Sequence, residues 1–371
     1  MKATFESAAS AHSLPFRRGA PLLALLLMML ALVAPAVATA LPGSDPLARG
    51  AIDGERMLQD LQILAHDSME GRQAGTAGGE RARRFLAESF AERGLRPVGG
   101  ERILSFTFSH PATGQATEGV NIIGMVPGGE HPGRYVIVTA HYDHLGVRDG
   151  EVYNGADDNA SGTAALLALA AHFLESPPRH SLLFAALDAE EIGLLGARAF
   201  VSNPPVPLDS VLMNVNLDMV SRSDSDELYA AGTHHYPFLT SLVEEAADAS
   251  AIHLLTGHDS PDLPPGDDWT MASDHGAFHE VGIPFIYFGV EDHLGYHHPS
   301  DTFENITPEF YLGAVNTVLD FLRIVDREGE EILGRRHRVG AELNDGTFEP
   351  AEGAFLESSP SSPRGPASIG K

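Results

Sequence analysis

Short, nearly continuous apolar runs alternate along the chain with longer segments in which apolar and polar residues are mixed. Runs of the first kind are typical of strands buried on both faces of a sheet, and they predict strands at 120–126, 135–140, 181–187, 211–217 and 284–288. Segments of the second kind place apolar residues three or four positions apart, as on one helix face. They predict helices at 80–93, 164–174, 194–201, 238–249 and 308–325.

Repeated strand–helix units of this kind predict an α/β fold with a mostly parallel central sheet and helices on both faces. No linker-like stretch interrupts the pattern, so we expect a single catalytic domain at 41–332. Beyond it the chain becomes polar and rich in Pro, Ser and Gly, which predicts a disordered C-terminal tail at 333–371.

The N-terminal segment at 1–40 has the layout of a secretory signal peptide. Basic residues precede an apolar run at 20–35, and the small residues at 36–40 offer two overlapping A-x-A cleavage sites. The apolar run is near the length that spans a bilayer, so an uncleaved membrane anchor is the alternative. We expect cleavage, and therefore an exported protein, periplasmic or secreted, that keeps no membrane span.

Composition restricts the chemistry available to the chain. Among 371 residues, 51 are acidic and 24 are Lys or Arg, giving a net charge of −27, which argues against nucleic-acid binding because phosphate neutralisation needs basic residues. Cysteine is absent, which excludes disulfides, thiolate metal sites and cysteine nucleophiles. The 18 histidines leave imidazole and carboxylate as the available metal ligands.

Histidine and carboxylate residues follow directly after the predicted strands. Residues 141–144 (HYDH), 188–191 (DAEE), Asp218 and 296–298 (YHH) each follow a strand, and the loop 155–162 (GADDNASG) opens a helix. In open α/β sheets, ligands bind beyond the carboxyl ends of the strands, so we expect these residues to form one site.

The residue types in this set favour a two-metal hydrolase. Imidazoles and carboxylates without thiolate suit Zn²⁺, with Mn²⁺ or Co²⁺ as substitutes. Three carboxylate ligands and a hydroxide balance the charge of two divalent ions, whereas a single ion would leave net negative charge in the cleft. Of the adjacent pair Glu190 and Glu191, one can bind metal while the other moves protons.

The sequence resembles the zinc aminopeptidases of peptidase family M28. Any one of the shared motifs is unspecific, but the ordered set, spanning roughly residues 55–325, is highly specific. The motifs are MEGRQAGT (69–76), AHYDHLG (140–146), GADDNASG (155–162), DAEEIGLLG (188–196), NLDMV (216–220), SDHGAFHEVGIP (273–284) and YHHPSDT (296–302).

The resemblance implies a set of five metal ligands. His141 and Asp218 would bind the first metal, Glu191 and His297 the second, and Asp158 would bridge the two. These assignments carry over from matching motif positions, not from spacing.

The resemblance also implies the catalytic residues. Glu190 would be the general base, Asp143 would orient His141, and Tyr296 matches a tyrosine that stabilises the tetrahedral oxyanion in some members. It further implies a cis peptide bond after Asp158. Five further polar residues of the motifs are given no catalytic role: Asp157, His144, His275, His298 and Asp274. For all of them except Asp274, a structural hydrogen bond is the simpler interpretation.

The function expected from these residues is a metal-dependent aminopeptidase acting on peptides with a free N-terminus. The alternatives are another M28-type metalloenzyme, either a carboxypeptidase or a glutaminyl cyclase, and a non-catalytic binding module. The presence of Glu190 and all five ligands argues against the binding module. A carboxypeptidase needs an Arg or Lys clamp for the substrate carboxylate, and only Arg222 lies near the ligand motifs. The preferred N-terminal residue and the oligomeric state stay open.

Overall fold

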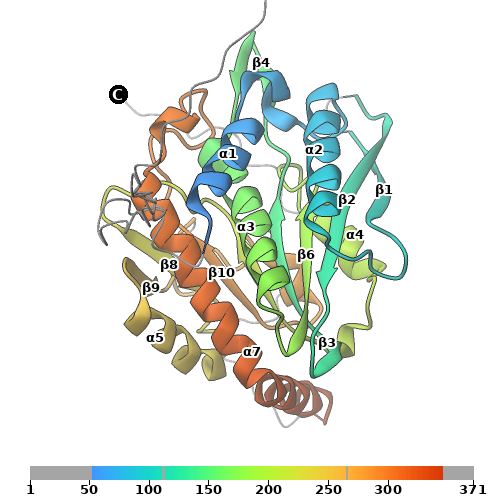
Figure 1. Ribbon diagram of the computed structural model, residues 1–371, viewed down its shortest axis with the longest axis vertical. Helices are drawn as coiled ribbons and strands as arrows, with labels where there is room; N and C mark the ends of the chain where they lie inside the picture. The colour runs from blue at the N-terminus through green and yellow to red at the C-terminus, as the bar shows by residue number, and fades with distance from the viewer. Residues whose placement is uncertain (1–51, 111–112, 265, 346–371) are drawn as a thin grey trace, which may run out of the picture. The chain divides into compact units, whose positions relative to one another are not determined.

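The computed structural model describes residues 52–110, 113–264 and 266–345 (Figure 1). The predicted signal segment at 1–40 lies outside these ranges. Within them, an eight-stranded sheet has the order β1-β2-β6-β3-β7-β10-β8-β9. Its strands are β1 (Ile103–Ser109), β2 (Ala116–Val126), β3 (His131–His141), β6 (His180–Leu187), β7 (Val211–Leu217), β8 (Glu227–Ala231), β9 (His253–Thr256) and β10 (Phe285–Gly289). A separate hairpin pairs β4 (Gly146–Arg148) with β5 (Glu151–Tyr153).

The four central strands β6, β3, β7 and β10 are mutually parallel. Antiparallel pairing occurs toward the two edges, where β2 joins β1 and β6, and β8 joins β10. This arrangement confirms the predicted mostly parallel sheet, and it directs the carboxyl ends of the four central strands to one side.

Helices cover both faces of the sheet (Figure 1). One face carries α1 (Gly54–Leu64), α2 (Ala77–Arg93), α3 (Gly162–Glu175), α5 (Thr240–Ala249) and α7 (Pro308–Asp345), and the other carries α4 (Leu195–Ser202) and α6 (His275–Glu280). The short helical segments are η2 (Asp67–Arg72), η3 (Ala156–Ser161), η4 (Leu208–Ser210), η5 (Pro237–Leu239) and η6 (Phe303–Asn305).

Strand β6 shows why the central strands are continuous apolar runs. Leu182 and Phe184 pack into the core under α3 and α7, while Leu183 and Leu187 pack into the core under α4 and α6. All four side chains are fully buried. A strand covered on both faces has no solvent-facing positions, so its sequence shows no alternation.

Helix α7 corrects one predicted boundary. The helix continues to Asp345, past residue 333, where a disordered tail was predicted to begin. Two contacts stabilise this last part of the helix. Leu333 is buried, and Arg336 donates to the backbone carbonyl of Val211 and, at 2.7 Å, to that of Leu208. The polar residues of this stretch therefore belong in part to a helix, and only 346–371 of the predicted tail lies outside the described residues. Within the described ranges, none of the helices combines the length and apolarity that a membrane span requires.

Candidate active site

The ends of the central strands bring the five predicted metal ligands together. His141 is the last residue of β3, and Asp218 follows β7 directly. The Nε2 atom of His141 lies 3.2 Å from Oδ1 of Asp218. Glu191 follows β6, and His297 lies in the segment after β10, with its Nε2 atom 3.4 Å from Oε2 of Glu191. Two histidine–carboxylate pairs are thus formed from four strands.

Asp158 lies between the two pairs and contacts both. Its Oδ1 atom is 3.4 Å from Nε2 of His141, and its Oδ2 atom is 3.1 Å from Nε2 of His297. A carboxylate whose two oxygens face two different imidazoles has the arrangement needed to bridge two cations. The peptide bond after Asp158 is cis, as predicted.

His144, whose role the sequence left open, also belongs to this cluster and makes a hydrogen bond there. Its Nδ1 atom lies 2.7 Å from Oε1 of Glu191 and 3.7 Å from Oδ2 of Asp158. Burial lowers the pKa of His144 to about 3, so the ring is neutral at pH 7 and its Nδ1–H donates to Glu191. The sequence motif HYDH contained this residue, but nothing in it indicated which histidine would face the carboxylates.

Asp143 connects the first ligand to the predicted base. Its Oδ1 atom accepts a hydrogen bond of 3.0 Å from the backbone N–H of Glu190 and lies 3.7 Å from Nδ1 of His141. The backbone carbonyl of Asp143 is closer to that nitrogen, at 3.1 Å, so residue 143 contacts His141 through both its side chain and its main chain. Burial, together with repulsion from Glu191 and Asp218, raises the pKa of Glu190 well above its ordinary value.

Other residues singled out from the sequence lie around this centre. Tyr296 stacks on His297, with ring centroids 4.0 Å apart. Asp157 accepts hydrogen bonds from the backbone and hydroxyl of Ser221, at 2.7 and 2.8 Å, and so has the structural role expected of it. His275 is also structural, since its Nε2 atom lies 2.8 Å from the carbonyl of Trp269.

Buried polar atoms without partners test whether the cluster suits a metal. Asp274 is fully buried, and neither of its carboxylate oxygens has a hydrogen-bond partner. Burial raises the pKa of Asp274 to about 8. Oδ2 of Asp143 and Nε2 of His144 are also buried without partners. A centre with more carboxylates than imidazoles, and with unpaired buried acceptors, needs cations to offset its charge.

The spacing of the donor atoms agrees with zinc. Ligand atoms that share one tetrahedral Zn²⁺, with bonds of roughly 2.0–2.1 Å, are about 3.3–3.4 Å apart. The separations between His141 and its two carboxylates, and between His297 and its two, lie between 3.1 and 3.4 Å. The donor set therefore fits zinc, and the residues that would hold it are His141, Asp218, Glu191, His297 and Asp158.

Two buried residues that the sequence analysis did not single out hold the loops of the site. Arg72 is fully buried, and burial lowers its pKa to about 10. Its guanidinium donates to four backbone carbonyls, those of Tyr142 (2.8 Å), Leu64 (2.7 Å), Asn154 (2.6 Å) and Gly155 (2.9 Å). The loops that carry Asp143 and Asp158 are therefore fixed by one side chain from η2.

Asp301 holds the same loop from the other side. Its carboxylate accepts from the backbone N–H groups of Asp157 and Asp158 at 3.0 Å each, and burial raises its pKa to about 7. Both Arg72 and Asp301 lie within the matched motifs. A single charged residue in a polar stretch gives no sign of burial, however, so their roles became visible only in the fold.

Comparison with known proteins agrees with this geometry. Residues 121–322, which include all five predicted ligands, match the model of peptidase family M28. The chain belongs to peptidase family M28. Among curated proteins, it is 35% identical to aminopeptidase YwaD of Bacillus subtilis over 189 residues, which cover 48% of this chain and 38% of that protein. The chain spans less than half the length of the curated relatives it matches first.

Solved structures show the same fold. A zinc aminopeptidase from Bacillus subtilis superposes with a TM-score of 0.60 at 19% identity, covering 72% of this chain and 94% of that one. A glutaminyl cyclase from Bacteroides thetaiotaomicron gives a TM-score of 0.59 at 19% identity, covering 73% and 98%. At these identities the likeness concerns the fold, which serves both kinds of enzyme.

Proposed function

We propose that this protein is an exported aminopeptidase, periplasmic or secreted, that uses two zinc ions to remove N-terminal residues from peptides. The observation that carries the proposal is the position of Asp158, whose two oxygens face His141 and His297 separately. The match to family M28 and the identity with aminopeptidase YwaD support peptide hydrolysis.

The chain's own residues supply proton transfer and positioning. Bound zinc would lower the pKa of a coordinated water and polarise the substrate carbonyl. Glu190, adjacent in sequence to the ligand Glu191, would accept the proton of the attacking water and deliver it to the leaving amine. Its raised pKa brings it closer to the pH at which it must exchange that proton. Asp143 would hold His141 in position, and Tyr296, stacked on His297, would donate to the developing oxyanion.

Charge at the centre favours an amine as the bound substrate terminus. Glu190, Asp143 and Asp274 lie at the site beyond the ligand carboxylates, with Asp143 and Asp274 buried and Glu190 half-buried. In their ionised forms, these groups would give the site a negative potential that attracts the ammonium of a free N-terminus. The same potential would repel the carboxylate that a carboxypeptidase must bind, so it favours an aminopeptidase.

The test is hydrolysis by zinc-loaded protein of aminoacyl anilides with free and with acetylated N-termini. We expect activity on the free amines only, loss of activity with a chelator, and two zinc ions at the active site by metal analysis. Reconstitution with Mn²⁺ or Co²⁺ should restore activity. Equal rates on acetylated substrates would contradict amine recognition, and a metal-loaded protein inert toward every peptide would contradict the peptidase assignment.

One observation favours carboxypeptidase activity as a second candidate. A pocket of about 210 Å³ beside Glu191 is lined by Leu145 and Ile192 and also by Arg148, a cation that the motif analysis did not place near the site. Arg148 could hold a substrate carboxylate. Hydrolysis of an N-acetylated dipeptide with a free C-terminus, abolished by Arg148→Met, would support this candidate, whereas an Arg148→Met variant that hydrolyses this dipeptide as fast as wild type would exclude the clamp.

A further inference from the structure

Two histidines lie side by side at the amino ends of the central strands, away from the predicted active site. His131 begins β3 and His180 begins β6, and the two residues are paired in the parallel register of these strands. Their rings stack, with centroids 4.6 Å apart and an angle of 12° between planes. Strand β3 runs from His131 to His141, so its full length separates this pair from the active site.

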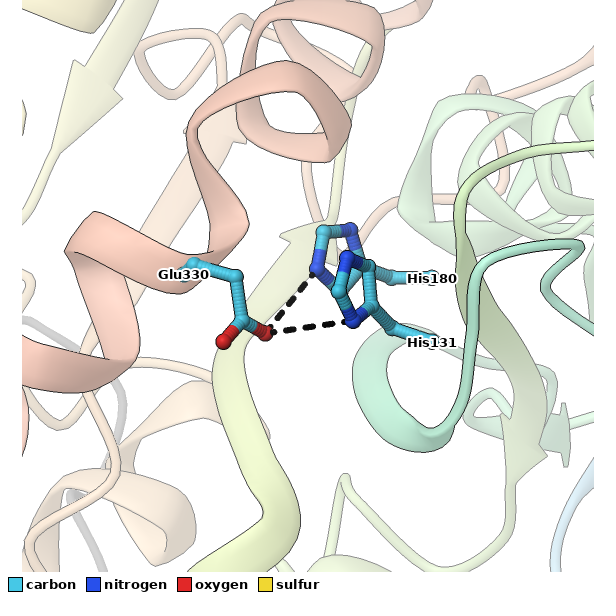
Figure 2. Close-up of side chains that lie close together, drawn as sticks. All are labelled: His131, His180 and Glu330. Atoms are coloured by element: carbon cyan, nitrogen blue, oxygen red, sulfur yellow. Dashed lines mark ion pairs between the residues drawn. The ribbon is translucent and has the colours of Figure 1, made fainter.

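Helix α7 brings a carboxylate to both rings (Figure 2). One oxygen of Glu330, Oε1, lies 3.5 Å from Nε2 of His180 and 3.7 Å from Nδ1 of His131. Gly329 makes this approach possible, because a Cβ atom at that position would lie 2.6 Å from Cε1 of His180 and 2.8 Å from its Nε2. The helix can therefore pass over the histidine only with glycine there.

Asp326, one turn earlier on α7, determines which ring nitrogen of His180 carries the proton. Its Oδ1 atom lies 3.1 Å from Nδ1 of His180 and its backbone carbonyl 3.0 Å from the same nitrogen. The Asp326 carboxylate also accepts from the backbone N–H groups of Arg179 and His180, at 2.8 Å each, which fixes its position. Since Nδ1 faces two acceptors it carries the proton, and in the neutral ring the lone pair is on Nε2. Carboxylates orient metal-binding histidines in the same way.

The Nε2 atom of His180 is the unsatisfied atom of this cluster. The His180 side chain is fully buried, and its Nε2 has no hydrogen-bond partner among the described residues. What it faces at 3.5 Å is an oxygen of Glu330, so in the neutral ring a lone pair is directed at a carboxylate. Two acceptors held this close need either a proton on Nε2 or a metal ion between them.

We propose that His131, His180 and Glu330 bind a divalent transition metal, Zn²⁺ in the first instance, at a site separate from the active site. Two imidazoles and one carboxylate are an established zinc donor set, with solvent in the fourth position. The separations of 3.5 and 3.7 Å are close to those of donors that share a tetrahedral ion.

An ion can reach the site, and one ring can adjust to it. The side chain of Glu330 is 55% exposed and that of His131 33% exposed, so the entry is open to solvent. Stacked rings do not direct both lone pairs at one point, so His131 turns about its side-chain torsions on binding, which its partial exposure permits. His180, held by Asp326, stays in place. The bound ion would join α7 to β3 and β6.

The test counts zinc by mass spectrometry on the full-length protein after metal removal and dialysis against Zn²⁺ at pH 7.5. Two variants, His131→Ala and Glu330→Gln, each remove one of the partly exposed donors. His180 is left unchanged because substituting a fully buried residue could prevent folding. We expect wild-type protein to bind one zinc more than either variant, with the same peptidase activity in all three. The control is Glu331→Gln on the same helix, which pairs with Arg335 and should bind as many ions as wild type.

Equal zinc content in wild type, His131→Ala and Glu330→Gln would overturn the proposal and leave a protonated histidine–glutamate ion pair as the explanation. The result does not depend on the proposed function. A protein without aminopeptidase activity would still show the difference of one zinc if this site exists. A protein with full activity and no such difference would refute this site alone.

Discussion

Clusters of histidine and carboxylate residues lie at both ends of the central parallel strands, and they differ in charge and exposure. The cluster at the carboxyl ends has more carboxylates than imidazoles, and its Asp158, Asp218 and Asp274 are buried. The cluster at the amino ends has two imidazoles, and the carboxylate that faces both of them, Glu330, is half exposed. The first cluster carries repulsion that cations relieve, whereas in the second a proton on His180 or one metal ion offsets the single carboxylate that faces both rings.

This difference separates two uses of the same residue types. At the carboxyl ends, burial and the neighbouring carboxylates raise the pKa of Glu190, as suits the proposed metal binding and proton transfer. At the amino ends, backbone N–H groups and the His180 ring hold the Asp326 carboxylate in place, and a metal there would act as a cross-link with no catalytic role. Residue type alone therefore does not distinguish a catalytic from a structural metal site, but the balance of charge does.

The largest expected effect separates base from ligand at the carboxyl ends. Glu190→Gln should lower kcat by roughly 10²–10⁴-fold while metal content and KM stay nearly unchanged, because an amide cannot accept the proton. Glu191→Gln should instead deplete one zinc, because it weakens a ligand. Kinetics and metal analysis of both variants check this. Loss of zinc in Glu190→Gln with retention in Glu191→Gln would mean that the two roles are exchanged.

His144 provides the next test at the same cluster. His144→Ala removes the donor 2.7 Å from Oε1 of Glu191 and should weaken zinc binding at that position by about 10–100-fold, as removal of a ligand's hydrogen-bond partner typically does. Competition with a chromophoric chelator measures the affinity directly. The exposed His298→Ala is the matched control, and equal affinities in the two variants would contradict the positioning role.

Gly329 tests the amino-end cluster through packing. Gly329→Ala places a methyl group against the His180 ring and should destabilise the protein by about 1–3 kcal/mol, while also lowering zinc content by one. Gly334→Ala on the same helix meets nothing closer than 3.5 Å, so helix propensity should make it stabilising by up to about 1 kcal/mol. Urea unfolding of both variants gives the comparison, and a stabilised Gly329→Ala would show that His180 does not need the space.

The smallest expected effect is on the pH dependence of the free energy of unfolding, measured on chelator-treated protein. Burial alone would lower the pKa of His180, but its contacts with Asp326 and Glu330 raise it above the ordinary value. A raised folded-state pKa contributes stability that is fully present below the unfolded value, near 6.5, and is lost as pH rises through the folded value.

Without metal, the stability difference between wild type and Glu330→Gln should therefore be larger at pH 6 than at pH 8, by less than about 1 kcal/mol because Glu330 is half exposed. With Zn²⁺ the order should reverse, since protons compete with the metal for Nε2. Unfolding curves at the two pH values, with and without zinc, measure both differences. A difference that does not vary with pH in either condition would contradict the ion pair and the metal site together.

Burial on both faces made the centre of the fold predictable from sequence. Strand β7 begins and ends where its apolar run does, at Val211 and Leu217. Strand β1 was missed because six of its seven residues are exposed or half-buried, so it carries no apolar run. Strands β8 and β9 are short, and their pairing with the sheet edge depends on tertiary packing.

The candidate site was predictable to the extent that its residues follow strands and match motifs. His141 and Asp218 meet both conditions. Arg72 meets only the second, and its function depends on carbonyls that no side-chain pattern specifies. The pair His131 and His180 meets neither, because only the register of β3 and β6 brings the two rings together.

Arg72 also has a consequence for the order in which the protein is made. Its acceptors Tyr142, Asn154 and Gly155 are synthesised 70, 82 and 83 residues later. Until they emerge from the ribosome, the guanidinium has only one of its four carbonyl acceptors, that of Leu64, and the loops bearing Asp143 and Asp158 reach their final form only when η2 docks against them. A fragment that begins after Arg72 would thus contain every proposed metal ligand and still lack the residue that holds their loops in place.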